Sequence, residues 1–191
     1  QVIATLADAD SVLELRRAFA PGLITALIRI EGRPFGLLAN NPAHLGGAID
    51  AQAGDKAARF MQLCDAFDIP LLSLCDTPGF MVGPEAEKQA TVRHISRMFV
   101  AAASFHSPLF TIAWPSGEFG AMGLEGAVRL GFAKELAAQP DAAAQKALFD
   151  KLVAKAYEQG KGLNMASYLE IDAVIDPADT RLVLGLGLSA A

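Results

Sequence analysis

Short apolar runs that alternate with amphipathic helical segments are the feature that most constrains the fold of this 191-residue chain. Residues 23–32 and 34–39 form two such runs, and their junction at Gly32–Arg33 predicts adjacent strands joined by a tight turn. From Asp50 onward apolar residues recur at intervals of three and four, which predicts a helix that ends before Ile69–Pro70. The apolar positions are Ala57, Phe60, Met61, Cys64 and Phe67, while Lys56, Arg59 and Asp65 fall elsewhere on the helix.

The same alternation continues through the middle of the chain. Residues 71–75 are nearly all apolar and are bounded by Pro70 and a turn sequence, which is typical of a strand buried on both faces of a parallel sheet. A helix is expected over residues 85–103 and another buried strand over residues 108–113. The inner face of that helix comprises Val92, Ile95, Phe99 and Ala102. Strand, helix, strand, helix and strand in this order predict an α/β fold.

The last third of the chain is predicted to be mainly helical. One helix is expected over residues 122–136, and a longer one opens at Pro140–Asp141. The apolar stripe of the longer helix comprises Leu148, Phe149, Leu152, Val153 and Ala156. An extended piece over residues 171–177 leads into a final helix, with Asp176 as N-cap and Pro177 as the first helical residue. Because this helix has almost no polar face, it is either buried by the chain or covers a partner.

Composition and charge narrow the class of protein. Sixteen Lys and Arg residues against 21 Asp and Glu residues give a net charge of −5, which argues against nucleic acid as a partner. No apolar run is long enough to span a membrane, and no export-signal pattern is visible, so a cytoplasmic protein is expected. The length suits a single domain over residues 1–191. Cys64 and Cys75 lie in apolar runs and are expected to be reduced, buried thiols.

No conventional set of catalytic or metal-binding side chains stands out. His44, His94 and His106 are far apart and lack a partner at ligand spacing, so structural or surface roles are favoured for them. Two glycine-containing loops, residues 46–50 and 76–83, lie at the ends of predicted elements, and the second follows a strand, where α/β sheets bind ligands. Glycines there leave N–H groups uncovered for an oxyanion, although plain turns explain the same residues.

A third loop, residues 114–123, holds three glycines ahead of a predicted helix. Phosphate binding at the helix N-terminus is one interpretation of it. Its glycine spacing matches no nucleotide-binding pattern and brings no lysine, so close packing of backbone on backbone is favoured.

These loops belong to a longer series of short motifs in a fixed order. The series comprises residues 29–42, 46–50, 55–60, 64–67, 69–70, 76–80 (Asp-Thr-Pro-Gly-Phe), 113–115 (Ala-Trp-Pro), 122–127 (Met-Gly-Leu-Glu-Gly-Ala) and 175–181. In this order the chain resembles the carboxyltransferase of biotin-dependent acyl-CoA carboxylases of the propionyl-, acetyl- and long-chain type. The resemblance covers the C-terminal, biotin-binding half of that enzyme. It implies a crotonase-like (ClpP/crotonase) ββα superhelix with projecting C-terminal helices.

The resemblance also implies a reaction, the transfer of carboxylate from carboxybiotin to an acyl-CoA, as a transferase or ligase of fatty acid metabolism. In that family the biotin cofactor is its own base, and paired backbone amides hold the two oxyanions that form. By this similarity the catalytic residues are Gly79 and Phe80. The cofactor-binding residues are Asp76, Thr77, Pro78, Gly46 and Gly47. No metal is expected in this domain.

Several partners follow from the same resemblance. The N-terminal carboxyltransferase half would complete the active site and hold the acyl-CoA, and the acidic charge of this chain fits a CoA held elsewhere. A biotin carboxyl carrier and a biotin carboxylase would supply the carboxylate. A homo-oligomer is expected, with no nucleic acid and no membrane.

One departure from the family concerns the junction of Ala103 and Ser104. The family carries a further βα unit there, whose glycine-rich turn is expected to hold the biotin oxyanion. Because its loss would remove a strand from the middle of the sheet, we expect an omitted segment between these two residues. Two other functions stay open, a biotin-dependent acyl-CoA decarboxylase subunit and a non-catalytic interaction module of the same fold. A hydratase or isomerase is less favoured, because no Glu pair or Asp suits proton transfer on an enoyl thioester.

Overall fold

The computed structural model describes residues 1–107, 110–120 and 123–190. They form two compact units, one from residues 1–107 with 181–190 and the other from residues 110–180, and each is described by itself. The expectation of one domain over residues 1–191 therefore stays a prediction. Within the described residues, none of the helices combines the length and the apolarity needed to cross a membrane.

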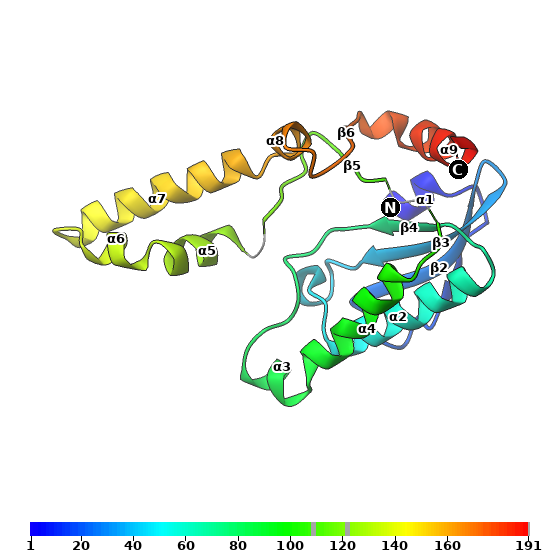
Figure 1. Ribbon diagram of the computed structural model, residues 1–191, viewed down its shortest axis with the longest axis horizontal. Coiled ribbons are helices and arrows are strands. Elements are labelled where there is room, and N and C mark those ends of the chain that lie inside the picture. Colours follow the sequence, from blue (N-terminus) through cyan, green and yellow to red (C-terminus); the bar gives the residue numbers. More distant parts are fainter. Residues whose placement is uncertain (108–109, 121–122, 191) are drawn as a thin grey trace. The chain divides into compact units, whose positions relative to one another are not determined.

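The first unit is built on a four-stranded sheet in the order β1-β2-β3-β4 (Figure 1). Strands β1, β2 and β3 pair antiparallel, and β4 pairs parallel with β3. Its elements are α1 (Val2–Leu6), β1 (Leu13–Leu15), β2 (Leu23–Ile30), β3 (Arg33–Asn40), the 3-10 turn η1 (Leu45–Gly47), α2 (Ala51–Ala66), β4 (Leu71–Leu74), α3 (Pro84–Lys88), α4 (Thr91–Ala103) and α9 (Thr180–Ala190). Within the described residues this unit is thus mixed α/β, with an antiparallel β1-β2-β3 part and one parallel crossover formed by β3, α2 and β4.

The predicted hairpin of β2 and β3 is confirmed, and one carboxylate holds its turn. Glu31 and Gly32 both have positive φ, 53° and 77°, as a two-residue turn that matches strand twist requires. Asp8 accepts hydrogen bonds from both turn amides, at 3.0 and 2.8 Å, and pairs with Arg181 at 2.8 Å. The hydrogen bond from Arg181, followed by that from Gly32, holds the pKa of Asp8 below its usual range. Asp8 therefore links the hairpin to the start of α9.

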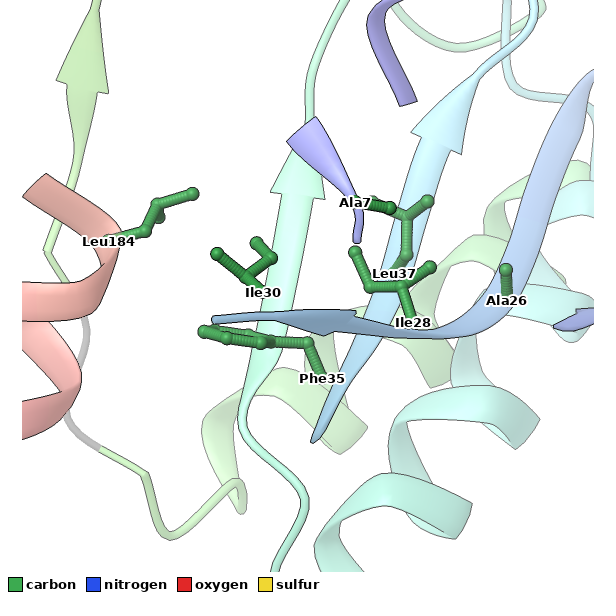
Figure 2. Packing of buried hydrophobic residues seen from close by; sticks show 7 residues of the cluster. All are labelled: Ala7, Ala26, Ile28, Ile30, Phe35, Leu37 and Leu184. Atoms are coloured by element: carbon green, nitrogen blue, oxygen red, sulfur yellow. The ribbon is translucent and has the colours of Figure 1, made fainter. Parts of the chain in front are cut away.

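Both faces of the sheet are covered, as the alternation of side chains along β2 and β3 requires. On one face, Leu184 of α9 and Ala7 after α1 pack with strand residues, and Leu184 points toward Ile30 (Figure 2). The strand residues of this cluster are Ala26, Ile28, Ile30, Phe35 and Leu37. On the other face, α2 packs its buried side against Leu23 and Leu38. The final helix is thus partly buried by the chain itself, although Leu182 and Leu186 stay exposed.

Helix α2 packs directly on β3 at a glycine of that strand. A Cβ atom on Gly36 would lie 2.3 Å from Sγ of Cys64 and 3.3 Å from the Phe60 ring. The N-terminus of the predicted helix is confirmed at Asp50, whose side chain accepts a hydrogen bond from the Ala53 amide at 2.8 Å.

One position on α2 differs from the sequence-based expectation. Lys56 is 1% exposed, and its Nζ donates to the carbonyl oxygens of Phe19 and Leu23 at 2.8 and 2.6 Å. Desolvation is the main cause of the lowered pKa of this amine. The ammonium group therefore fastens the loop before β2 to α2. Periodicity could not reveal this role, because the acceptors are backbone atoms more than thirty residues away.

Two further expectations in this unit are wrong in part. Strand β4 is only half-buried, because it lies at an edge of the described sheet. The helix expected over residues 85–103 is divided into α3 and α4 at Ala90, which has a left-handed φ of 52°. In α4, Ile95 is buried as expected, but Val92 and Phe99 are 81% and 55% exposed. The face of α4 that packs on α2 thus starts one residue earlier, at Thr91.

The second unit is mainly helical. It contains β5 (Ile112–Ala113), α5 (Leu124–Gly131), α6 (Ala133–Ala137), α7 (Ala142–Gln159), α8 (Gly162–Ser167), β6 (Ala173–Val174) and the 3-10 turn η2 (Pro177–Asp179). Strands β5 and β6 pair parallel. The expected strand 108–113 is thus short, and residues 108–109 lie outside the described residues. The helix expected over residues 122–136 is two helices that meet at Phe132, and Met122 lies outside the described residues.

The helix start predicted at Asp141 is confirmed, and the predicted N-cap Asp176 caps a 3-10 turn that precedes the final helix, which begins at Thr180. Asp141 caps α7 by accepting from the Ala144 amide at 2.8 Å, and Asp176 caps η2 by accepting from the Ala178 amide at 2.8 Å. The expected stripe of α7 is its half-buried side. It faces α5, where Arg129 lies 5.3 Å from the Phe149 ring centroid and Glu125 accepts a hydrogen bond from Tyr157 at 2.9 Å.

The close approach of α2 to the sheet generates the first prediction. We expect Gly36→Ala to lower the free energy of unfolding by about 1–3 kcal/mol, because the added methyl group overpacks the contact with Cys64. Urea denaturation followed by circular dichroism measures the change. Gly126→Ala in α5 is the matched control, since its Cβ meets no atom within 4 Å, and it should leave stability unchanged or slightly raised. Equal stability of both variants would contradict the contact.

The two thiols generate the second prediction. Cys64 is fully buried, and burial raises its pKa to about 11, whereas Cys75 is exposed, contrary to expectation. Partial desolvation and then the Asp76 carboxylate still raise the pKa of Cys75. We expect N-ethylmaleimide to modify one thiol per native chain, faster as pH rises, and two thiols in urea, as counted by mass spectrometry. Cys75→Ser should abolish native labelling, and a variant that still reacts would show that Cys64 is accessible.

Candidate functional site

The two glycine-containing loops meet at one edge of the sheet. Because β3 and β4 are parallel neighbours, their carboxyl ends lie side by side, and each is followed by one loop. The Ile49 amide donates to the Gly79 carbonyl at 3.0 Å, and the Met81 amide donates to the Ile49 carbonyl at 2.9 Å. These two bonds pair Ile49 with Phe80 in a single parallel bridge. The structure therefore brings together the two loops that were singled out in the sequence.

Gly47 is required where the two loops touch. Its φ is 86°, and a Cβ atom on it would lie 2.4 Å from the carbonyl oxygen of Asp76. Any side chain would force the loops apart. Gly46, with φ of 61°, also has a left-handed backbone but meets nothing within 4 Å, so only its conformation favours glycine.

Asn40 joins the loops and was not singled out in the sequence. Its Nδ2 donates to the Gly47 carbonyl at 3.0 Å, and its Oδ1 accepts from the Asp76 amide at 3.2 Å. One side chain at the end of β3 thus satisfies a backbone group of each loop. A polar amide directly after an apolar strand was the available signal, but its partners depend on the parallel pairing of β3 and β4.

Of the two amides that the sequence singled out, Gly79 and Phe80, only that of Phe80 is available within the described residues. The Gly79 N–H donates to Thr77 Oγ1 at 3.0 Å, and the Thr77 hydroxyl donates to the Gly79 carbonyl at 3.1 Å. The Phe80 N–H has no acceptor within the part of the chain that the structure describes. In the parallel bridge this amide belongs to the residue between the two bonded groups, so it faces away from Ile49. It is therefore one group of this loop that can donate to an oxyanion, and the Thr77 and Val82 amides likewise have no acceptor among the described residues.

Aromatic rings form the apolar side of this site. The rings of Phe80 and Phe99 pack edge to face, with centroids 5.7 Å apart. Phe80 is 38% exposed, so the ring can meet a ligand as well as its neighbour. The site thus combines a free main-chain donor with an apolar wall, which suits a neutral ring that develops negative charge on an oxygen.

The other sequence candidates lie outside this arrangement. Nδ1 of His94 lies 2.6 Å from Asp55, and Nδ1 of His106 lies 3.0 Å from Asp65, so both histidines tie later segments to α2, in agreement with structural roles. In the third loop, a Cβ on Gly117 would lie 3.0 Å from the Trp114 carbonyl, which agrees with close backbone packing there. The described residues contain no group of three side chains that could hold a metal ion.

Comparison with known proteins identifies the family of the chain. Residues 1–115 match the family model described as the carboxyl transferase domain. The methylmalonyl-CoA carboxyltransferase 12S subunit of Propionibacterium freudenreichii is 36% identical over 94% of this chain and 38% of its own length. The beta4 subunit of the biotin-dependent long chain acyl-coenzyme A carboxylase of Mycobacterium tuberculosis is 34% identical over 96% of this chain and 40% of its own length.

Solved structures agree with this result. A single-chain, multi-domain long-chain acyl-CoA carboxylase is 48% identical, with a TM-score of 0.83 over 96% of this chain and 20% of that one. The hexameric transcarboxylase 12S core is 33% identical, with a TM-score of 0.91 over 99% of this chain and 41% of that one.

The lengths of these alignments carry two more facts. The chain spans about two fifths of the length of the curated relatives that it matches. The beta6 subunit of Mycobacterium tuberculosis aligns over 216 positions with all of this 191-residue chain, so at least 25 of its positions have no counterpart here (216 − 191). By the matched domain, the relatives and the structural neighbours together, the chain belongs to the carboxyl transferase family of biotin-dependent acyl-CoA carboxylases.

Proposed function

We propose that this chain is the C-terminal, biotin-binding half of a carboxyltransferase with a crotonase-like fold, and that it takes part in carboxyl transfer to an acyl-CoA. The observation that carries the proposal is the pair of bonded glycine loops that leaves the Phe80 N–H without a partner among the described residues. A biotin ring needs such a donor and an apolar wall, and the Phe80 amide with the Phe80 and Phe99 rings offers both.

The chain's own groups act by holding charge rather than by moving protons. When bound, biotin supplies the base for the acyl-CoA α-proton and carries the carboxylate that is transferred. The Phe80 N–H donates to the oxygen that becomes negative. The Phe80 and Phe99 rings exclude part of the water from this site. The Thr77 hydroxyl fixes the Gly79 peptide, and Asn40 fixes the separation of the loops, so that the donor is in place before reaction.

Of the predicted site residues, two change their proposed roles. Gly79 acts through its shape and its carbonyl, because its N–H is already bonded to Thr77. Gly47 acts as the contact between loops rather than as a ligand of the cofactor. We keep Phe80 as the catalytic donor, and Asp76, Thr77, Pro78 and Gly46 as residues that shape the biotin site.

The proposal requires partners for the whole reaction. An N-terminal carboxyltransferase half would hold the acyl-CoA, and a biotin carboxyl carrier and a biotin carboxylase would deliver the carboxylate. Assembly of several copies is proposed by analogy with the transcarboxylase 12S core, whose solved structure is described as a hexamer. The reaction uses no metal in this unit.

One observation favours a second candidate, a non-catalytic interaction module. At least 25 positions of a relative have no counterpart here, and α4 passes directly into Ser104, whose amide donates to the Val100 carbonyl at 3.2 Å. If the second oxyanion turn is truly absent, the Phe80 amide alone would not hold both oxyanions. The state of the Ala103–Ser104 junction therefore separates the two candidates.

Proteolytic digestion of the natural protein, purified from its organism, tests the Ala103–Ser104 junction. Trypsin should cut after Arg97 and Arg129, so one peptide, residues 98–129, spans Ala103–Ser104. We expect this peptide to be absent and replaced by peptides that carry at least 25 further residues, because the carboxyltransferase needs the additional βα unit. Tandem mass spectrometry gives the result. Recovery of the unaltered peptide would favour the interaction module and predict no transfer activity.

The carboxyl-transfer proposal is tested on the same natural protein, with an N-terminal half supplied. Phe80→Pro removes the N–H, whereas Phe80→Leu removes the ring but keeps the N–H. We expect the proline variant to lower kcat by about 100-fold or more relative to the leucine variant, as the loss of one oxyanion donor does. Transfer of radiolabel from carboxylated biotin to acyl-CoA is the measurement, and thermal melting confirms folding.

Two outcomes would contradict this proposal. Equal kcat in the two variants would show that the Phe80 amide is not a donor in the reaction. Label that moves only from acyl-CoA to biotin would favour the acyl-CoA decarboxylase subunit.

A further inference from the structure

A separate cavity of about 260 Å³ lies in the first unit, between the β1–β2 edge and the C-terminal half of α2. Its wall is mainly apolar, formed by Leu15, Phe60, Leu63 and Ala66. None of the loop residues assigned to the biotin site lines it. Its size suits a small ligand and is at the lower limit of small-molecule pockets.

The polar groups deep in this cavity are already satisfied. Thr25 Oγ1 donates to the Leu15 carbonyl at 2.8 Å. Lys56 Nζ is held by backbone carbonyls of the loop before β2, the shortest bond being 2.6 Å to Leu23. These groups therefore offer no hydrogen bonds to a ligand, and they leave an apolar floor that favours a hydrocarbon chain.

Two arginines at the cavity add positive charge beside its apolar floor. Arg16 and Arg59 both line it, and within the described residues neither forms an ion pair, since Glu14 pairs with Arg17 at 3.5 Å. Arg59 donates one side-chain hydrogen bond, to the side-chain oxygen of Gln62 at 3.4 Å. In a chain with a net charge of −5, these two guanidinium groups and the buried Lys56 ammonium place three positive charges near one site, and the Glu14 carboxylate, which pairs with Arg17, offsets them in part.

The backbone of Arg16 adds a separate observation. Its φ of 54° is left-handed, which costs free energy in a residue with a side chain. Among the described residues eight non-glycine residues have a positive φ, and at Arg16 it opens a turn in which the Phe19 amide donates to the Arg16 carbonyl at 3.0 Å. The turn fixes the point from which the Arg16 side chain leaves the backbone beside the cavity.

We propose that this cavity binds a small amphipathic carboxylate, with an aliphatic chain on the apolar wall and the carboxylate between Arg16 and Arg59. A guanidinium group binds a carboxylate through two parallel hydrogen bonds, and a neighbouring apolar wall strengthens the interaction by excluding water. The cavity is too small for a coenzyme, so the ligand is a free acid of medium chain length.

Isothermal titration of the full chain with octanoate tests the proposal. We expect saturable binding of one octanoate per chain, no comparable binding of 1-octanol, and binding of inorganic phosphate at least tenfold weaker than that of octanoate. Arg16→Gln and Arg59→Gln should each weaken octanoate binding at least tenfold. Arg93→Gln is the matched control, because Arg93 is exposed on α4 and does not line the cavity.

A variant that keeps Arg16 and Arg59 shows whether binding can be lost without loss of folding. Ala66→Phe should fill the cavity and abolish octanoate binding while the melting temperature stays that of the unmodified chain. Equal binding of 1-octanol would overturn the role of the arginines, and equal binding of phosphate would overturn the role of the apolar wall. Absence of octanoate binding, or unchanged binding in the arginine variants, would overturn the site. None of these results depends on carboxyl transfer.

Discussion

The contact of Gly36 with Cys64 sets the distance between α2 and the sheet, and the geometry of the proposed biotin site depends on it. Helix α2 begins at Asp50, directly after the first glycine loop, so the position of that loop follows from the position of the helix. Strand β3 contains Gly36 and ends at Asn40, which holds both loops. A change in the separation of helix and sheet would therefore shift the loops relative to the side chain that joins them.

The site consists mainly of backbone groups, and this explains its weak signal in the sequence. Glycine positions could be found by inspection, because few residues accept a left-handed φ. Which amides are free could not be found, since that depends on whether Thr77 occupies the Gly79 N–H and on how Ile49 pairs with Phe80. The sequence thus located the loops, but the structure was needed to distinguish the donor from its supports.

Features that depend on residues close together in the sequence were predicted, whereas features that depend on tertiary contacts were missed. The β2–β3 hairpin, the helix starts at Asp50 and Asp141 and the half-buried side of α7 follow from residues within a few positions of each other, and all were predicted. Lys56 and Asn40 were missed, because their partners are backbone atoms brought near by tertiary packing. The parallel pairing of β4 was predicted, but its burial on both faces was not found, and among the described residues β5 pairs with β6 rather than with β4.

In helix α4 the sequence predicted a buried face that is wrong in part, and the difference is informative. Its sequence has two apolar sides, and the structure buries only the one that contains Thr91 and Ile95. Val92, Phe99 and Val100 lie on the exposed remainder, although large apolar side chains gain free energy when covered. This side ends next to the Ala103–Ser104 junction, where we expect a further βα unit by resemblance to the family. We propose that this unit packs on the exposed side of α4 and covers Val92, Phe99 and Val100. On this proposal the sequence lacks an internal segment, and the protein keeps its enzyme function.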